Sequence, residues 1–292
     1  MRIGIGLPAA VPGASPMELG RWAAESERLG FQSLGVLDRL VYDNLDPLVA
    51  LGAAAARTER AELITTVLGV PWRESAVVLG KQLGSLDRLS GGRLTAGLAL
   101  GGWPEDYATT GIPLASRGAA FDEMLATMRR VWTGALAGAS GPLPALPHAR
   151  PGVLFGGLVP AAFARVATLG DGWVAPFFGY EMFVEGIASA RRAWAEASRP
   201  GHPRIVVERY FCLGPGADGI ADDYLEHYYG QQYSGLARAD TLTTHERLHA
   251  EIGRLSEAGC DDLILFPCSG DLRQVALLSE AVTTTPVRDR VG

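Results

Sequence analysis

The sequence predicts an α/β fold in which eight parallel strands and their helices close into a (β/α)8 TIM barrel. Short apolar segments alternate with longer amphipathic ones along the 292 residues. This alternation is typical of parallel strands joined by helices, and a barrel of this kind fills about 250 residues. An open doubly wound sheet is the alternative, but the GxGxxG pattern that often follows its first strand is missing after Gly6. We expect one domain over residues 1–292.

The predicted strands are short and mostly apolar, as expected for strands that are buried on both faces. Several of them end at proline, glycine or a charged residue, which favours a turn. They cover Arg2–Leu7, Phe31–Leu37, Leu63–Leu68, Arg93–Leu100, Val153–Gly157, Trp173–Pro176, Arg204–Leu213 and Asp261–Pro267.

The predicted helices carry apolar residues at helical spacing. They cover Pro16–Leu29, Pro47–Thr58, Arg73–Leu89, Arg117–Trp132, Pro160–Leu169, Tyr180–Ala197, Ala221–Tyr229, His245–Ala258 and Leu272–Val282. In the third of these, the residues expected to face the sheet are Val77, Val78, Leu83, Leu86 and Leu89. Two segments are predicted to be inserted loops: Ala135–Pro151, which is rich in glycine, proline and alanine, and the polar segment Gly230–Thr243.

Composition and charge narrow the class of protein. The net charge of −6 disfavours nucleic acid and anionic membranes as partners, and no apolar segment approaches the roughly 20 residues of a membrane helix. Cys212, Cys260 and Cys268 form no CxxC pair, which fits a reducing cytoplasm. The five histidines are scattered without an HExxH motif, so no metal site is expected.

The site of a TIM barrel lies at the carboxyl ends of its strands. Here those ends are largely apolar, aromatic or glycine, which suits a pocket for a flat ring system fixed by a few polar groups. An oxidoreductase that takes its chemistry from an organic cofactor and acts on a small molecule fits this composition. The positions are Leu7–Pro8, Asp38–Arg39, Thr65–Val67, Gly101–Trp103, Gly156–Gly157, Pro176–Phe178, Arg209–Tyr210 and Pro267.

Several motifs occur in order along the chain: VLGVPWRESAVVLGKQ, LDRLSGGRLTAGLALGGW, GIPLASRGAAFDEMLATMRRVWTG, LFGG and LGDGW. Together they resemble the bacterial luciferase-like family of flavin- or deazaflavin-dependent oxidoreductases, and the resemblance extends roughly from Arg2 to Ala281. It implies a TIM-barrel enzyme, a bound redox coenzyme and a homodimer as one plausible assembly.

Two coenzymes divide this family, and the resemblance favours the deazaflavin coenzyme F-420 over FMN. FMN members bring reduced flavin to oxygen and are monooxygenases, whereas deazaflavin members transfer a hydride. The chain is short for a luciferase-type monooxygenase, and Asp38 and Thr66–Val67 fall at positions that match deazaflavin-binding relatives. We therefore expect a reductase that transfers hydride from reduced F-420 to a small metabolite. An FMN monooxygenase and a non-catalytic flavin-binding homologue are the alternatives.

The resemblance also assigns candidate catalytic residues. An aspartate at the place of Asp38 lies beside the ring in relatives, although a helix cap or a partner for Arg39 is the structural alternative. Arg39 stands where relatives often carry a histidine, and arginine cannot act as a base. We expect Arg39 to orient an anionic substrate or a developing negative charge, and Tyr107 or water to supply the proton.

Candidate cofactor-binding residues come from three strand ends. Thr66–Val67 matches a non-proline cis peptide that supports the back of the ring in relatives, or is an ordinary buried strand end. Gly101 and Gly102 open the loop after the fourth strand, and Gly102 replaces a glutamate of relatives. Gly156 and Gly157 precede a helix, where bare amides attract phosphate; a tight turn is the alternative. Among weaker candidates, Arg209 could face the pocket, and the tyrosines at 224, 228 and 229 are expected to pack a helix.

Overall fold

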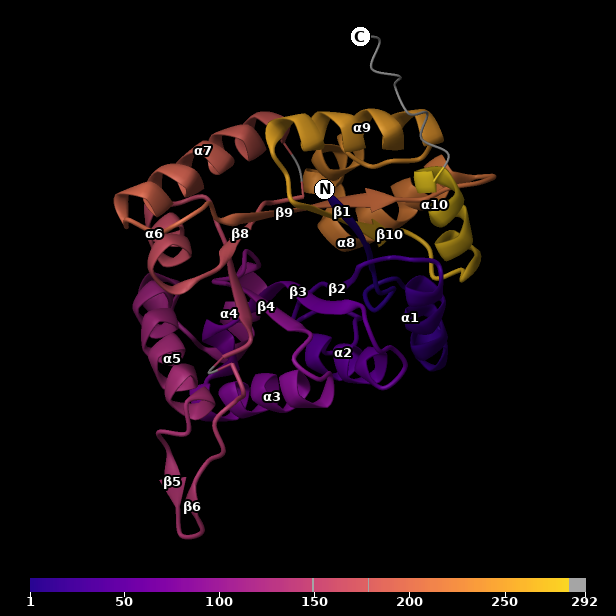
Figure 1. Ribbon diagram of the computed structural model, residues 1–292. Coiled ribbons are helices and arrows are strands. Elements are labelled where there is room, and N and C mark those ends of the chain that lie inside the picture. Colours follow the sequence, from indigo (N-terminus) through magenta and orange to yellow (C-terminus); the bar gives the residue numbers. More distant parts are fainter. Residues whose placement is uncertain (149, 178, 284–292) are drawn as a thin grey trace.

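The protein is a closed barrel of eight parallel strands inside a ring of helices (Figure 1). The computed structural model describes residues 1–148, 150–177 and 179–283. Each barrel strand pairs in parallel with both of its neighbours, so the predicted (β/α)8 fold is confirmed. In order around the barrel the strands are β1 (Arg2–Gly6), β2 (Ser33–Val36), β3 (Glu62–Gly69), β4 (Leu94–Ala99), β7 (Gly152–Gly156), β8 (Gly172–Val174), β9 (Arg204–Phe211) and β10 (Asp262–Pro267).

The helices pack on the outside of the barrel, and short 3-10 turns lie at Pro16–Glu18, Pro71–Arg73 and Leu114–Ser116. The helix α2 shows how a local signal sets a boundary: Pro47 occupies its first turn, and the Asp46 carboxylate accepts hydrogen bonds from the amides of Leu48 and Val49. The helices are α1 (Leu19–Arg28), α2 (Pro47–Ala55), α3 (Ala76–Leu89), α4 (Pro104–Thr110), α5 (Arg117–Trp132), α6 (Pro160–Leu169), α7 (Tyr180–Glu196), α8 (Ala217–Ala239), α9 (His245–Ala258) and α10 (Arg273–Thr283).

Two apolar cores result from the alternation of side chains along each strand. On β9, Val207 and Phe211 belong to the core between the strands and the helices. Val206 and Tyr210 belong to the core inside the barrel. This alternation decides which polar residues of a strand can reach the barrel interior.

The segment Gly230–Thr243 is not the loop that its polarity predicts. Residues up to Ala239 continue α8, which is kinked at Gly230, where φ is +68°. Gln231, Gln232 and Tyr233 are exposed on this helix, whereas Ala237 is buried. A helix that lies over the barrel mouth needs only a few apolar contacts, and this is why its composition resembled that of a loop. The helix α4, which was not predicted, begins at Pro104 and precedes Gly111 in the left-handed conformation.

The buried face of α3 agrees with the prediction at Leu83 and Leu86 but not at the other three residues. Val77, Val78 and Leu89 are exposed, and the buried residues include Leu79, Leu83 and Leu86. The face is set by α5, which approaches α3 closely at Gly80. A Cβ atom at Gly80 would lie 3.1 Å from the Met128 Cα atom. Close packing of two helices, rather than the spacing of apolar residues, selects the inward side.

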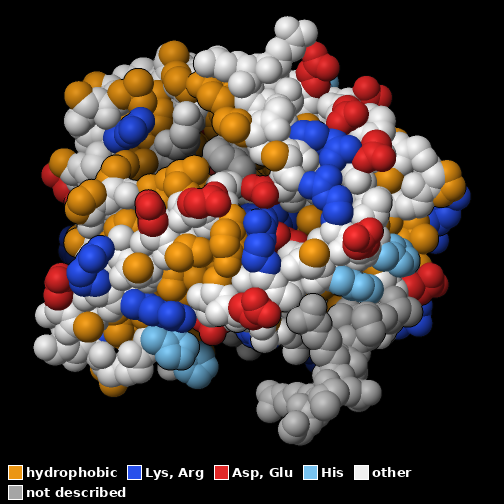
Figure 2. Space-filling view, turned by 90° about the horizontal axis from the view of Figure 1, so that it is seen from above, with side chains coloured by type: hydrophobic (Ala, Val, Ile, Leu, Met, Phe, Trp, Pro, Cys, Tyr) orange, Lys and Arg blue, Asp and Glu red, His pale blue; other side chains and the backbone are white. Residues whose placement is uncertain are grey.

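The predicted loop Ala135–Pro151 contains a small antiparallel hairpin, β5 (Ala137–Gly138) with β6 (Gly141–Pro142). The hairpin extends away from the barrel (Figure 1), and the segment does not contribute to the mouth of the barrel. Across residues 1–148, 150–177 and 179–283, no helix has the length and apolar character needed to cross a membrane. On the face shown in Figure 2, acidic and basic side chains are interspersed, without a broad patch of either sign.

Candidate active site at the carboxyl ends of the strands

A cavity of about 950 Å³ opens at the carboxyl ends of the barrel strands, where the fold class predicts a site. Its wall combines glycines, aliphatic and aromatic side chains with few charged groups. Residues from the strand ends include Asp38, Thr66, Val67, Ala99, Gly156, Val174 and Glu208; residues from the loops and helices include Trp103, Glu105, Arg117, Arg165, Phe177, Tyr228, Tyr229 and Tyr233. Phe178 lies outside the described residues.

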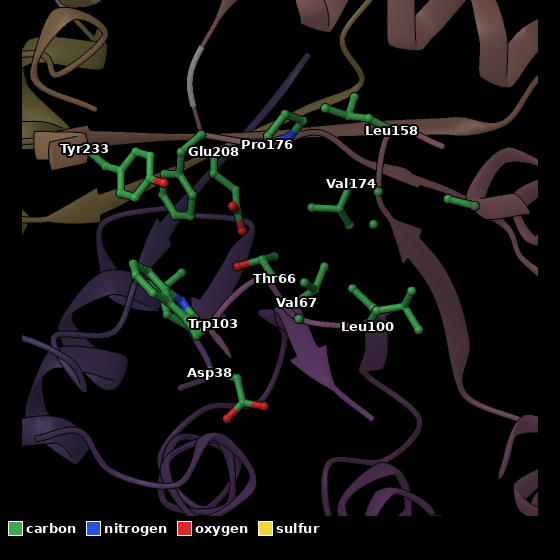
Figure 3. A pocket seen from close by; sticks show the side chains of 18 of the residues that line it. Asp38, Thr66, Val67, Leu100, Trp103, Leu158, Val174, Pro176, Glu208 and Tyr233 are labelled. Carbon is green, nitrogen blue, oxygen red and sulfur yellow. The ribbon is translucent and has the colours of Figure 1, made fainter. Parts of the chain in front are cut away.

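Glu208 is an acid in this wall that was not predicted from the sequence. Its residue is 2% exposed, and its Oε1 atom has no hydrogen-bond partner within the described ranges. Figure 3 shows its carboxyl group directed into the pocket toward Thr66. Burial raises the pKa of Glu208 well above its usual range, and a hydrogen bond with Thr66 and the charge of Arg209 offset only part of that rise. Burial therefore favours the protonated, uncharged form of this carboxyl group.

Strand alternation explains why Glu208, rather than Arg209, reaches the cavity. Arg209 points outward between β9 and α9, where its Nε atom lies 2.7 Å from the Glu251 carboxylate, and its Nη1 atom donates to the carbonyl oxygen of Phe177 at 3.0 Å. The expectation that Arg209 could face the pocket is wrong. The signal was present in the sequence, because Val206, Glu208 and Tyr210 share one face of the strand.

Asp38 lies in the cavity wall as predicted, but its carboxylate is held by the protein. Arg73 approaches it at 3.0 Å, and the amide of Gly69 donates to it at 2.8 Å. Burial raises the pKa of Asp38, while the charge of Arg73 and the Gly69 hydrogen bond oppose the rise. Arg39, the partner suggested by the sequence, takes no part. The geometry makes Asp38 a tie between the ends of β2 and β3.

Arg39 does not contribute to the cavity wall. Its side chain is 8% exposed, and its guanidinium carbon lies 3.7 Å from the centre of the Trp103 ring. It donates to the carbonyl oxygen of Tyr228 at 2.6 Å and to Glu105 at 2.7 Å. The role predicted for Arg39, to orient an anionic substrate, is incompatible with this position. The residue instead joins α4 to α8.

Tyr107 is also placed away from the role predicted for it. Its hydroxyl donates to the carbonyl oxygen of Leu100, its ring packs edge-on against Trp72, and it is not part of the cavity wall. Burial raises the pKa of Tyr107. A buried phenol that is already bonded to a carbonyl is a poor source of a proton for a substrate in the cavity.

Thr66 and Val67 are joined by a cis peptide bond, as the resemblance implied. The pairing of β3 with β4 shifts between Thr65 and Leu68, so the two residues form a bulge. Both line the cavity. The bulge places Thr66 beside Glu208 and Val67 opposite Gly156.

The four predicted glycines all line the cavity, for different reasons. A Cβ atom at Gly101 would lie 2.0 Å from the Trp72 ring, so this glycine is required by packing. Gly102 has open space around it. At Gly156 a Cβ atom would meet Val67 at 3.1 Å, and Gly157 has a φ of +123°. The backbone of this last pair is therefore bare toward the cavity.

Two arginines lie at the same end of the cavity as Gly156 and Gly157. Arg165 comes from α6, the helix that follows these glycines, and its Nε atom lies 2.7 Å from Asp122. Arg117 begins α5, and its guanidinium carbon lies 5.7 Å from the Tyr107 ring centre. This end of the cavity therefore combines bare amides with positive charge, an arrangement that binds phosphate.

The opposite end of the cavity is aromatic. Figure 3 shows Trp103 and Tyr233 on one side of the pocket and Leu100 and Leu158 on the other. Tyr228 and Tyr229, which were expected to serve only in helix packing, line this aromatic end as well. The described residues contain no cluster of histidine, cysteine or acidic side chains that could hold a metal ion, and the three cysteines are buried and free.

Comparison with the sequences and structures of known proteins agrees with the barrel fold. The profile of the luciferase-like monooxygenase family matches residues 1–288, and the chain belongs to this family. An uncharacterized Mycobacterium tuberculosis protein is 33% identical over 56% of this chain and 60% of its own length. An F-420-dependent glucose-6-phosphate dehydrogenase of Beutenbergia cavernae is 31% identical over 44% of this chain and 41% of its own. The chain thus spans about 60% or less of these curated relatives.

A solved structure shows the same fold over the whole barrel. The monooxygenase RslO1 from Streptomyces bottropensis superimposes with a TM-score of 0.80 over 97% of this chain and 99% of its own, at 22% identity. Family and fold together define a luciferase-like protein built on a (β/α)8 barrel.

Proposed function

We propose that the protein is an F-420-dependent reductase, in which Glu208 is the acid that completes the reduction of a polarised double bond in a small molecule. The observation that carries the proposal is the position of the Glu208 carboxyl group, which is buried in the cavity wall with no hydrogen-bond partner for Oε1 within the described residues, and whose pKa is raised by this burial. Reduction by hydride requires a proton at the second atom of the bond, and a neutral buried carboxylic acid is suited to donate one.

The cavity has room and contacts for a deazaflavin. Its volume of about 950 Å³ lies near the top of the range of about 300–1,000 Å³ usual for ligand pockets. Thr66 and Val67 would support the ring, and Gly156 and Gly157, with Arg117 and Arg165 nearby, would hold the phosphate end. When bound in its reduced form, the coenzyme supplies a hydride, which carries two electrons.

Side chains of the protein would carry out the remaining steps. Glu208 donates its proton to the atom of the substrate that becomes negative as the hydride adds to its neighbour, so the substrate gains two hydrogens and two electrons. The carboxylate that forms is stabilised by its hydrogen bond with Thr66 and then recovers a proton from solvent. The apolar wall excludes water from the reacting bond and strengthens these interactions.

A relative and two positions in the cavity wall support the choice of F-420. A relative with 31% identity is named for F-420, and Asp38 and Thr66–Val67 lie in the wall at the positions that the family resemblance assigned to deazaflavin binding. An FMN monooxygenase is the second candidate, because the monooxygenase RslO1 and a type II Baeyer-Villiger monooxygenase solved in complex with FMN have the same fold. A buried acid with a raised pKa in the cavity wall favours the reductase, since oxygen activation by a reduced flavin does not depend on one.

The test is to incubate the purified protein with F-420 or FMN, desalt it, and record the absorbance of the retained coenzyme. We expect retention of F-420, and oxidation of reduced F-420 without oxygen when an unsaturated ketone or imine is added. Tight retention of FMN without F-420, together with oxygen-dependent product formation, would overturn the proposal. Retention of either coenzyme without any turnover would point to a non-catalytic homologue.

A further inference from the structure

We infer that the substrate is an uncharged aromatic compound, bound between Trp103, Phe177, Tyr228, Tyr229 and Tyr233 with its polarised double bond facing Glu208. This inference deepens the proposed function and rests on it for the reaction, although the binding subsite can be tested alone. The five residues come from the loop between β4 and α4, from α8 and from the loop after β8, and all of them line the cavity.

The aromatic wall is built before any ligand binds. Phe177 stacks on Tyr210, with ring centres 4.5 Å apart and planes inclined by 10°. Trp103 lies 6.0 Å from Tyr228 and 5.9 Å from Tyr229 between ring centres. Because these rings hold one another, a flat ligand loses little free energy in ordering them, and it gains from stacking and edge contacts.

The aromatic subsite surrounds the acid. Tyr210 stands two residues after Glu208 on the same face of β9, and its hydroxyl lies 3.0 Å from that of Tyr229. Burial raises the pKa values of Tyr228 and Tyr229. These phenols stay neutral, so they form a polar but uncharged rim around the carboxyl group.

Charge in this half of the cavity excludes an anionic substrate. Two cations contact the aromatic residues, and both are already engaged: Arg39 is stacked on Trp103 and paired with Glu105, and Arg209 donates to the carbonyl oxygen of Phe177 and is paired with Glu251. The arginines that line the cavity, Arg117 and Arg165, lie at the opposite end, together with Gly156. A carboxylate or phosphate group near Glu208 would be buried without a counterion, at a large free-energy penalty. A sugar phosphate therefore does not fit this subsite.

The test compares the binding of four probes by calorimetry, with the coenzyme-free protein and with the F-420-loaded protein. Benzylideneacetone is an uncharged aromatic enone, cinnamate carries a carboxylate on the same styryl group, cyclohexenone lacks the aromatic ring, and glucose 6-phosphate is an anionic sugar. We expect benzylideneacetone to bind at least about tenfold more tightly than each of the other three.

A pair of variants locates the binding. Tyr233→Ala removes an exposed ring of the subsite and is expected to weaken benzylideneacetone binding about fivefold. The matched control Tyr180→Ala, on α7 outside the cavity, is expected to leave it unchanged. If cinnamate, cyclohexenone or the sugar phosphate binds as tightly, or if Tyr233→Ala has no more effect than Tyr180→Ala, the inference is wrong.

The two proposals can fail separately. If benzylideneacetone binds through Tyr233 but F-420 is not retained, the aromatic subsite stands and the coenzyme assignment fails. If F-420 is retained and reduced F-420 is consumed only with cyclohexenone or anionic acceptors, the reductase stands and the aromatic substrate class fails.

Discussion

Two glutamates of the barrel, Glu62 at the amino ends of the strands and Glu208 toward the carboxyl ends, are held in opposite ways. At the amino ends of the strands, Arg2 and Arg204 bind Glu62 and Asp262 in a closed network. The Arg204 guanidinium lies 2.7 Å from Glu62 and 2.8 Å from Asp262, and Arg2 lies 3.1 Å and 2.6 Å from the same two carboxylates. Burial alone would raise the pKa of Glu62, but the hydrogen bonds and charges of Arg204, with Thr95 and Arg2, lower it.

At the carboxyl ends, Glu208 has no cation on its own face of β9. Its pKa is raised, although it is a glutamate buried in the same barrel. The two glutamates differ in their partners as well as in their burial, since the Glu62 side chain is 16% exposed and Glu208 is 2% exposed. A carboxylate that is fully paired stabilises the fold, whereas a carboxyl group left without a counterion stays protonated and is available to a ligand.

Replacing the unpaired acid should have the largest effect on the reaction. Glu208→Gln keeps the size and burial of the side chain but removes the proton, so we expect turnover with reduced F-420 to fall about 10²–10⁴-fold. F-420 binding should persist, which desalting and absorbance will show. In the unchanged protein the rate should fall as pH rises through the raised pKa of Glu208. Equal turnover by the variant would remove Glu208 from the mechanism.

Breaking the paired end should affect stability and leave the chemistry intact. Glu62→Ala leaves Arg204 with one fewer partner in a mostly buried network, and we expect the free energy of unfolding to fall by about 3 kcal/mol at pH 7. Because the pKa of Glu62 is lowered on folding, its contribution exists above the unfolded value, near about 4.3, and is lost as pH falls through the folded value. Urea denaturation at pH 7 and pH 4 measures both effects. A loss of turnover without a loss of stability would contradict the division between the two ends.

The pH dependence of stability should have the opposite sign at Glu208. Its folded pKa lies above the unfolded one, so its contribution is full below about pH 4.3 and is lost as pH rises through the folded pKa. Over that interval stability should decrease by about 1.4 kcal/mol per pH unit. Glu208→Gln lacks this term, so the variant should gain stability relative to the unchanged protein as pH rises. Thermal or urea unfolding from pH 4 to pH 9 checks this, and parallel curves would mean that Glu208 ionises normally.

The smallest effect is expected at Arg39, which joins α4 to α8 at the mouth of the barrel. Arg39→Lys keeps the charge near Glu105 but loses the flat guanidinium stacked on Trp103, so we expect a loss of about 1 kcal/mol. The loss should appear as faster hydrogen exchange in residues 228–233 of α8, while exchange at the amino ends of the strands stays unchanged. Uniformly faster exchange would show instead that Arg39 supports the whole fold.

Most of the fold could be predicted from local patterns, and the exceptions have identifiable causes. All eight predicted strands are present, because continuous apolar segments bounded by turn residues are a strong local signal. The helical residues after Gly230 were missed, since a polar helix over the barrel mouth has the composition of a loop. The exposed face of α3 was misassigned, because the approach of α5 at Gly80 depends on a contact between distant segments.

Some features of the candidate site could likewise be predicted from local patterns, and others depend on long-range contacts. The strand ends that carry Asp38, Thr66, Gly101 and Gly156 could be located from the chain alone, because in a parallel barrel the carboxyl end of every strand faces the same side. Whether a side chain at such a strand end is free or already bonded could not be predicted from the chain alone. Closure of the barrel and packing of α8 bring Arg73 and Arg39 to their partners. Order along the chain sets which residues reach the mouth of the barrel, and long-range contacts set their ionisation: the pKa of Glu208 is raised because burial outweighs the Thr66 hydrogen bond and the charge of Arg209.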